Sequence, residues 1–123
     1  ERALQHRAMG TRKDVMYVLS EIKDAWAAQP LRQMLSRPTD PNWTPPQMKY
    51  GHRINLPDGS QVTSDECSDA IWAAFCLAKK GDQPSLSAIE QLAAGSQGRD
   101  KELLHAAIQL LRNNMQKEPE VTP

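Results

Sequence analysis

The chain has 123 residues, a length that suits one domain with a single hydrophobic core and is too short for two. Its 15 basic and 15 acidic residues cancel, so no overall field favours nucleic acid, an anionic membrane or an acidic substrate. It contains no apolar run of about 18 residues and no secretory signal pattern. We therefore expect a cytoplasmic protein without membrane contact. Because the chain starts at Glu1 without methionine, we also expect a domain of a larger protein.

The first 37 residues have the apolar periodicity of helices. One long amphipathic helix is predicted over residues 2–28 because apolar residues recur on one arc. The residues of this arc are Leu4, Ala8, Val15, Val18, Leu19, Ile22 and Trp26. Pro30 ends the pattern, and residues 31–36 are expected to form a short second helix with Pro30 at its first position.

Residues 38–48 are rich in proline and surround Trp43, a composition that predicts an extended arm without regular hydrogen bonding. Beyond this arm, residues 53–56 and 61–63 have strand character. The segment between them reads Pro57-Asp58-Gly59-Ser60, which predicts a tight turn with a left-handed glycine. We expect a short β-hairpin that leads directly into the next helix.

Residues 63–81 form the predicted helix around which the rest of the chain packs. Thr63 and Glu66 have the spacing of a capping box, and Lys79, Lys80 and Gly81 suit a helix end. The segment is apolar on nearly every side between residues 70 and 78, which is typical of a central helix.

The same segment carries Trp72 and both cysteines. Trp72 falls about 100° from the apolar side that contains Phe75, so the core does not obviously claim it. We expect it to share a surface with Trp43, either covered by the arm or facing a partner. Cys67 and Cys76 stand too far apart along a helix for a disulfide. We expect two reduced thiols, Cys76 being the more exposed.

Two more helices are predicted after residue 81. The first ends at Gly95, and Asp100 is expected to cap the second. The apolar residues that should face the core are Leu86, Ile89, Leu92, Ala93, Leu103, Leu104, Ala107, Ile108, Leu110, Leu111 and Met115. Residues 117–123 are polar and proline-containing, which predicts a disordered tail.

These elements predict a mainly α single domain of four to five helices with one short β-hairpin. Its parts are an amphipathic and a short helix (1–37), the proline-rich arm (38–48), the hairpin with a three-helix core (49–116), and the tail (117–123).

No metal site, cofactor site or catalytic constellation is expected. Glu102 and His105 have the Glu-x-x-His spacing of di-metal helix bundles, but the second copy and the two further glutamates are absent. Asp65, Glu66 and Asp69 resemble an ion-binding cluster, yet acids in a first helical turn are explained by the helix dipole.

Two segments support alternatives to a simple helical domain. Lys49, Tyr50, His52 and Arg53 form a basic and aromatic cluster that suits a phosphate site or a small nuclease-like or toxin-type enzyme. The same composition is common at a solvated strand edge.

Residues 86–111 have the outline of a DNA-binding helix-turn-helix, in which Arg99 and Lys101 would meet phosphates. Gln91 is large for the tightly packed turn position, and the second helix begins with a charge-neutral set of residues. An ordinary antiparallel helix pair explains the same pattern.

The leading hypothesis is a non-enzymatic protein–protein interaction or accessory, regulatory module, because no catalytic pattern survives comparison with its structural explanation. The expected binding residues are Trp43, Tyr50, His52, Arg53 and Trp72. The expected partner is a protein, with nucleic acid as the alternative.

Overall fold

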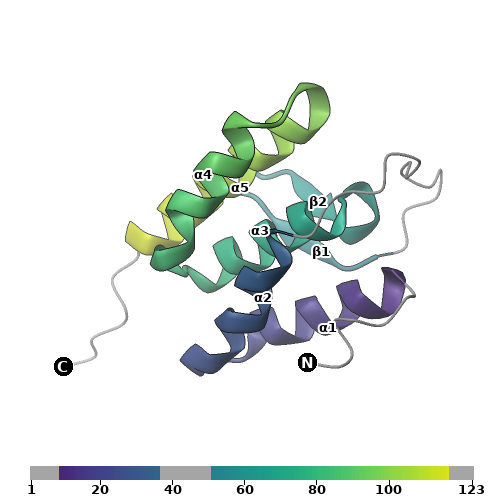
Figure 1. The fold of residues 1–123 in the computed structure, drawn as a ribbon, viewed down its shortest axis with the longest axis vertical. Coiled ribbons are helices and arrows are strands. Elements are labelled where there is room, and N and C mark those ends of the chain that lie inside the picture. The colour runs from purple at the N-terminus through teal and green to yellow at the C-terminus, as the bar shows by residue number, and fades with distance from the viewer. Residues whose placement is uncertain (1–8, 37–50, 117–123) are drawn as a thin grey trace.

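The computed structural model describes residues 9–36 and 51–116 (Figure 1). In these ranges the chain forms five α-helices, three short 3₁₀ helices and one two-stranded antiparallel sheet, which confirms the predicted mainly α fold with a short hairpin. The expected arm, the expected tail and the site residues Trp43, Lys49 and Tyr50 lie outside the described residues. No helix within these ranges is long and apolar enough to cross a membrane.

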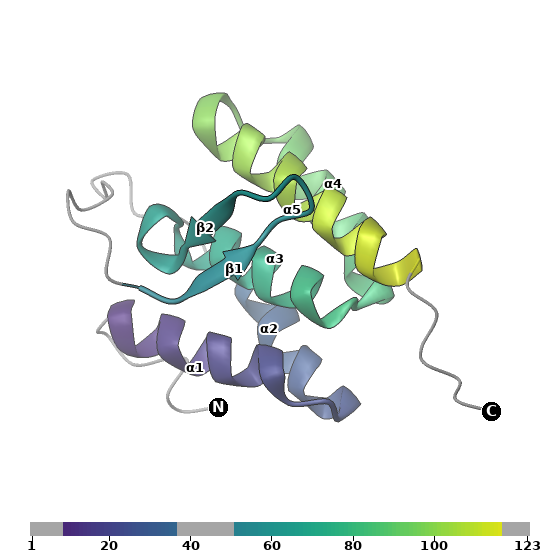
Figure 2. The ribbon, with the colours of Figure 1, turned by 180° about the vertical axis from the view of Figure 1, so that it is seen from behind.

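Helix α3 (Asp69–Lys80) lies at the centre, with α1 (Met9–Glu21) and α2 (Ala28–Met34) on one side and α4 (Leu86–Ala94) and α5 (Gly98–Gln116) on the other (Figures 1 and 2). It packs directly against α1, α2 and α5. Every residue of α3 from its first to Ala78 is buried. Burial on all sides explains why its sequence is apolar nearly all round and confirms its central position.

The central helix begins later than predicted. The Thr63–Glu66 capping box exists, with the Thr63 N–H donating to Glu66 Oε2 at 2.8 Å. It caps the start of the 3₁₀ helix η3 (Ser64–Glu66) and not the start of α3. Cys67 is extended, and α3 starts with Ser68 as its N-cap. The predicted helical start at residue 63 is therefore wrong.

A lysine from another helix explains this break. Lys13 Nζ donates to the carbonyl of Ser64 at 2.8 Å and also to the carbonyl of Cys67. In an uninterrupted helix those carbonyls would accept backbone N–H groups four residues later. The end of α3 is as predicted, since Gly81 closes it with a left-handed φ of 71°.

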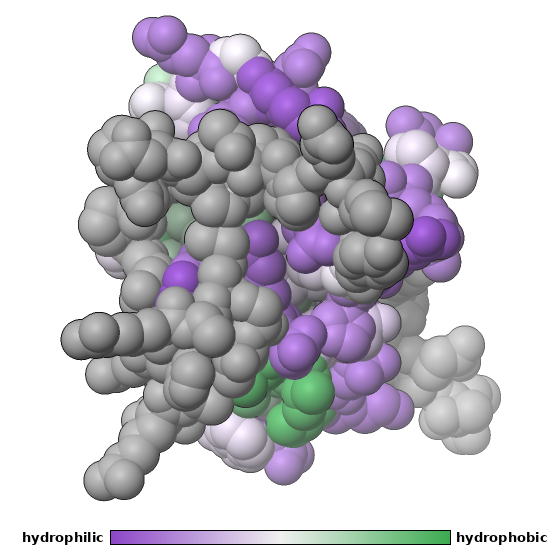
Figure 3. Space-filling view, turned by 90° about the vertical axis from the view of Figure 1, so that its right-hand side faces the viewer, coloured by the Kyte–Doolittle hydropathy of each residue, from purple (hydrophilic) through white to green (hydrophobic). Residues whose placement is uncertain are grey.

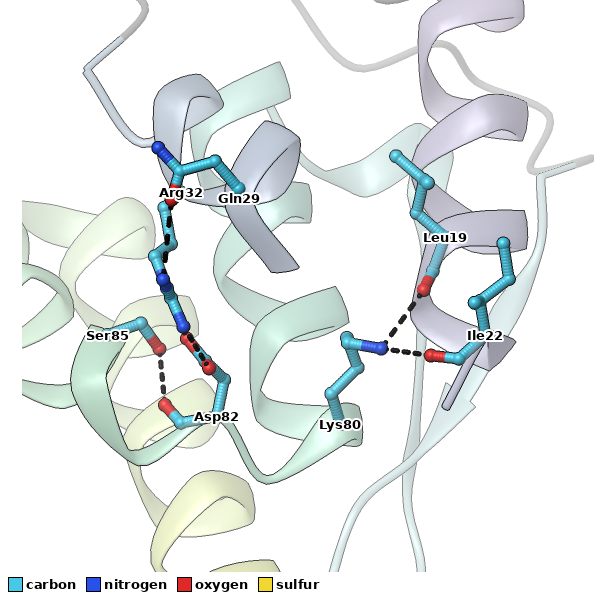
Figure 4. Close-up of polar contacts among 7 residues, drawn as sticks. All are labelled: Leu19, Ile22, Gln29, Arg32, Lys80, Asp82 and Ser85. Atoms are coloured by element: carbon cyan, nitrogen blue, oxygen red, sulfur yellow. Dashed lines mark hydrogen bonds and ion pairs between the residues drawn. The ribbon is translucent and has the colours of Figure 1, made fainter. Parts of the chain in front are cut away.

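The predicted long N-terminal helix is also interrupted. Helix α1 ends at Glu21, and a 3₁₀ turn, η2 (Ala25–Ala27), leads into α2. Lys80 Nζ donates to the carbonyls of Leu19, at 3.3 Å, and Ile22, so the end of α1 is closed by a side chain of α3 (Figure 4). Pro30 is the third residue of α2, not the first residue of a separate helix over 31–36.

The inward face of helix α1 matches the predicted arc only in part, since Leu19 is buried and Val15 and Ile22 pack against the core. Its buried residues are Arg12, Lys13, Met16, Leu19 and Ser20. Val18 is 55% exposed, and Trp26 beyond the helix is 58% exposed, so their predicted core positions are wrong. The described residues that are visible in Figure 3 are mostly hydrophilic, and apolar side chains gather near the lower centre of the view.

The hairpin and the last two helices follow the sequence pattern closely. Strand β1 (Arg53–Asn55) pairs with β2 (Gln61–Thr63), and Ile54 and Val62 are opposite each other and buried. Gly59 has the expected positive φ, 90°. Helix α5 begins at Gly98, so Asp100 lies in its first turn and is not the cap.

Candidate binding groove beside strand β1

A groove of about 420 Å³ runs beside β1 and is lined by residues of β1, α5, α1 and α3. Its polar lining residues are Tyr17, Arg53, Asn55, Lys79, Asn113 and Asn114, and the others are Ile54, Leu56, Pro57 and Leu110. None of these lining residues is acidic. The groove therefore combines two cationic side chains and three amides with a short apolar wall.

Tyr17 of α1 supports one end of this groove, because its ring contacts side chains of α3 and of the residue before β1. Its ring is stacked on His52 with centroids 4.2 Å apart and lies 6.4 Å from Trp72. Lys79 Nζ lies 4.1 Å from the Tyr17 ring centroid and 3.5 Å from Glu21 Oε2. A cation above an aromatic face is held electrostatically, so Lys79 is fixed at the groove.

Trp72 does not lie at a surface. Its side chain is 0% exposed, and its indole N–H donates to the Lys13 carbonyl at 3.3 Å. The buried Trp72 offers no exposed face to a partner, and its cover by the arm stays a prediction. Helix α1 supplies both the ring contact and the acceptor, and Trp43, its expected neighbour, is not among the described residues.

His52 and Arg53, expected as binding or catalytic residues, have different surroundings. His52 Nε2 lies 3.0 Å from Asp14 Oδ1, and the imidazole is 38% exposed. Arg53 is exposed, lines the groove, and makes no ion pair with any described residue. The structure brings these two residues to the same end of β1, whereas Lys49 and Tyr50 cannot be placed.

The residues proposed for DNA binding do not share one surface. Arg99 forms an ion pair with Glu66 at 2.7 Å, and Lys101 lines a separate groove between α4 and α5. Positions two apart on a helix differ by about 200° in direction. Helices α4 and α5 also lie side by side (Figures 1 and 2), as in an αα-hairpin, whereas helix-turn-helix helices cross at about 90–120°.

Sequence reasoning missed a buried charged cluster at the contact of α1 and α3. Arg12, Lys13 and Asp69 are 5%, 3% and 7% exposed, and Arg12 Nε lies 2.7 Å from Asp69 Oδ2. Burial lowers the pKa of Lys13, and the charge of Asp69 opposes that shift. The available signal was Asp69, which shares a helix face with the large Trp72.

Within the described ranges, no group of three or more His, Cys, Asp or Glu residues is arranged to hold a metal ion. Comparison of the chain with protein-family models, with curated proteins and with solved structures finds no match.

Proposed function

We propose that the chain is a non-enzymatic interaction module that binds a protein partner through the groove beside β1. The observation that carries the proposal is the composition of this groove. Its lining offers cations, amides, a phenol and apolar side chains, but no carboxylate, imidazole or thiol. The two lining residues that could act in acid–base chemistry, Tyr17 and Lys79, are in contact with each other. Such a surface suits recognition by charge and hydrogen bonding.

The geometry around the groove supports the same role. Tyr17 and Lys79 are held by ring and ion-pair contacts, so part of the binding surface is ordered before a partner arrives. Ordering in advance lowers the entropy that binding costs. Arg53, in contrast, is exposed and keeps its charge available for a partner.

Site-specific photo-cross-linking in source-cell extract tests this function. A benzophenone side chain is placed at Asn113, an exposed residue of α5 that lines the groove, and a matched one at Gln109, an exposed residue of α5 in the α4–α5 groove. We expect a partner protein cross-linked at position 113 and absent at 109. Excess unmodified chain should compete for it, and the Arg53→Glu variant should not.

The proposal fails if both positions capture the same proteins, if neither captures any, or if Arg53→Glu competes as well as the unmodified chain. Circular dichroism of each variant checks that the helices remain folded.

A further inference from the structure

The hairpin register shows which backbone groups of β1 face its partner strand. Ile54 is paired with Val62, and the Leu56 N–H donates to the Ser60 carbonyl at 2.8 Å. Hydrogen-bonded and non-hydrogen-bonded positions alternate along an antiparallel pair, so these two pairs belong to the hydrogen-bonded set. The residues that alternate with them in β1 direct their backbone groups away from β2.

Arg53 and Asn55 are those alternating residues. The register places their backbone N–H and C=O groups outside the β1–β2 ladder, and no loop or turn bond involves them within the described parts of the chain. Both residues line the groove, and both side chains are exposed while that of Ile54 is buried. The edge of β1 therefore presents two donors and two acceptors of strand geometry beside an accessible groove.

The lining of this groove differs in charge from that of two other grooves in the described structure. The groove at the ends of α1 and α3 contains Glu21 and Asp82 beside three lysines, and the α4–α5 groove contains Glu90 beside Lys101 and Arg112. The groove beside β1 is lined by Arg53 and Lys79 without any acidic residue, and Lys79 is paired with Glu21 outside the lining. Arg53 therefore supplies the charge that is complementary to an acidic ligand.

The geometry points to an extended acidic peptide segment that adds to β1 as a third strand. The inference rests on the proposed function and names the class of partner. Backbone bonds to Arg53 and Asn55 supply affinity, and an acidic side chain opposite Arg53 lies beside its guanidinium. The peptide residue opposite Ile54 turns its side chain toward the apolar wall, so an alternating acidic and apolar segment fits.

Titration of the isotope-labelled full chain with capped hexapeptides, followed by NMR, tests the inference. The probe is Thr-Glu-Val-Glu-Val-Thr, and its charge-reversed control is Thr-Lys-Val-Lys-Val-Thr. The peptide is placed antiparallel to β1 with its glutamates opposite Arg53 and Asn55, so the glutamate N–H groups face β1 and the valine N–H groups face away. Two further probes carry N-methyl groups on both glutamates or on both valines.

We expect the acidic peptide to bind with a dissociation constant on the order of 100 μM, since only four backbone groups and one ion pair contribute. Amide signals of Arg53 and Asn55 should shift. Lysine substitution or glutamate N-methylation should weaken binding by about tenfold or more, and valine N-methylation by less than about threefold. Arg53→Gln should weaken binding of the acidic peptide, and Arg112→Gln, in the α4–α5 groove, should not.

Three outcomes would each overturn strand addition. They are equal affinity of the acidic and basic peptides, equal effects of the two N-methyl patterns, and no binding at about 1 mM peptide. A protein partner cross-linked at position 113 in that case would leave the interaction role standing with another binding mode. Loss of the cross-link with retained peptide binding would instead contradict the proposed function.

Discussion

At the scale of single residues, the contact between α1 and α3 is made by charges as well as by apolar side chains. The Arg12–Asp69 ion pair and the Lys13 ammonium are buried where removal from water is costly. Lys13 offsets part of that cost with two carbonyl bonds. Loss of one partner would weaken the compensation of a buried charge, so these contacts help to fix how α1 sits on α3.

The burial of the two cysteine thiols predicts how they react. Cys67 and Cys76 are both fully buried, which corrects the expectation that Cys76 is more exposed. Burial raises the pKa of Cys67 from 9.0 to about 12 and raises that of Cys76 as well. We expect neither thiol to react with a disulfide reagent in the native protein at pH 8, and both to react after denaturation.

The raised pKa values also set a pH dependence of stability. Above pH 9 the unfolded chain loses thiol protons that the folded chain keeps, so the free energy of unfolding falls as pH rises toward about 12. The fall is at most about 1.4 kcal/mol per pH unit for each thiol. Lys13 and Lys80, whose pKa values are lowered by burial, contribute with the opposite sign below 10.5.

Urea denaturation at pH 8, 9 and 10 measures this slope. Because the lysine contribution is common to all variants, Cys67→Ala and Cys76→Ala should each have a flatter decline than the wild type. A wild-type slope in both variants would show that the thiols ionise equally in the folded and unfolded chains.

At the scale of elements, α1 and α3 each supply a lysine that donates hydrogen bonds to backbone carbonyls near one end of the other helix. Lys13 of α1 binds carbonyls of Ser64 and Cys67 ahead of α3, and Lys80 of α3 binds carbonyls at the end of α1. Local signals predicted the features that depend on adjacent residues, such as the Gly81 helix end. They could not predict these two interruptions, because each depends on a residue more than 50 positions away.

Replacing Lys80 with methionine tests this mutual closure. Lys80→Met keeps much of the packed stem and leaves the carbonyls of Leu19 and Ile22 without their donor, so we expect a loss of about 1–2 kcal/mol in unfolding free energy. Amide hydrogen exchange near the end of α1 should accelerate. The exposed Lys101→Met is the matched control, with a change of about 0.5 kcal/mol or less. Unchanged exchange near residues 19–24 in Lys80→Met would contradict the role given to Lys80.

At the scale of the whole molecule, buried residues from the five described α-helices and both strands join in one hydrophobic cluster. Apolar periodicity predicted most of this cluster, including Phe75 of α3 and Leu104 and Leu111 of α5. For α1 it predicted Leu19 but missed the buried Arg12 and Lys13, which contact residues far along the chain. Of the residues that line the candidate groove, the sequence predicted only Arg53 as a binding residue. Tertiary packing brings Tyr17, Lys79 and α5 beside Arg53, and local patterns do not report such packing.

The two described tryptophans differ in burial, so substituting each of them compares the stability contribution of a buried and of an exposed indole. Trp72 joins α3 to α1 through the Lys13 carbonyl and, through Tyr17, to His52 beside β1. We expect Trp72→Ala to lower the unfolding free energy by about 3–5 kcal/mol, because it creates a large cavity at the centre of the cluster. Trp26→Ala, at an exposed position, should change it by about 0.5 kcal/mol or less.

Chemical denaturation followed by circular dichroism measures both variants, and hydrogen exchange shows where protection is lost. Because Trp72 links three elements, its removal should reduce protection in α1 and α3 together within one cooperative transition. Trp72→Phe keeps most of the packing but removes the indole donor, so it should cost less than Trp72→Ala. If Trp26→Ala proved as destabilising as Trp72→Ala, the exposed position of Trp26 in η2 would be wrong, since the predicted arc would then bury it.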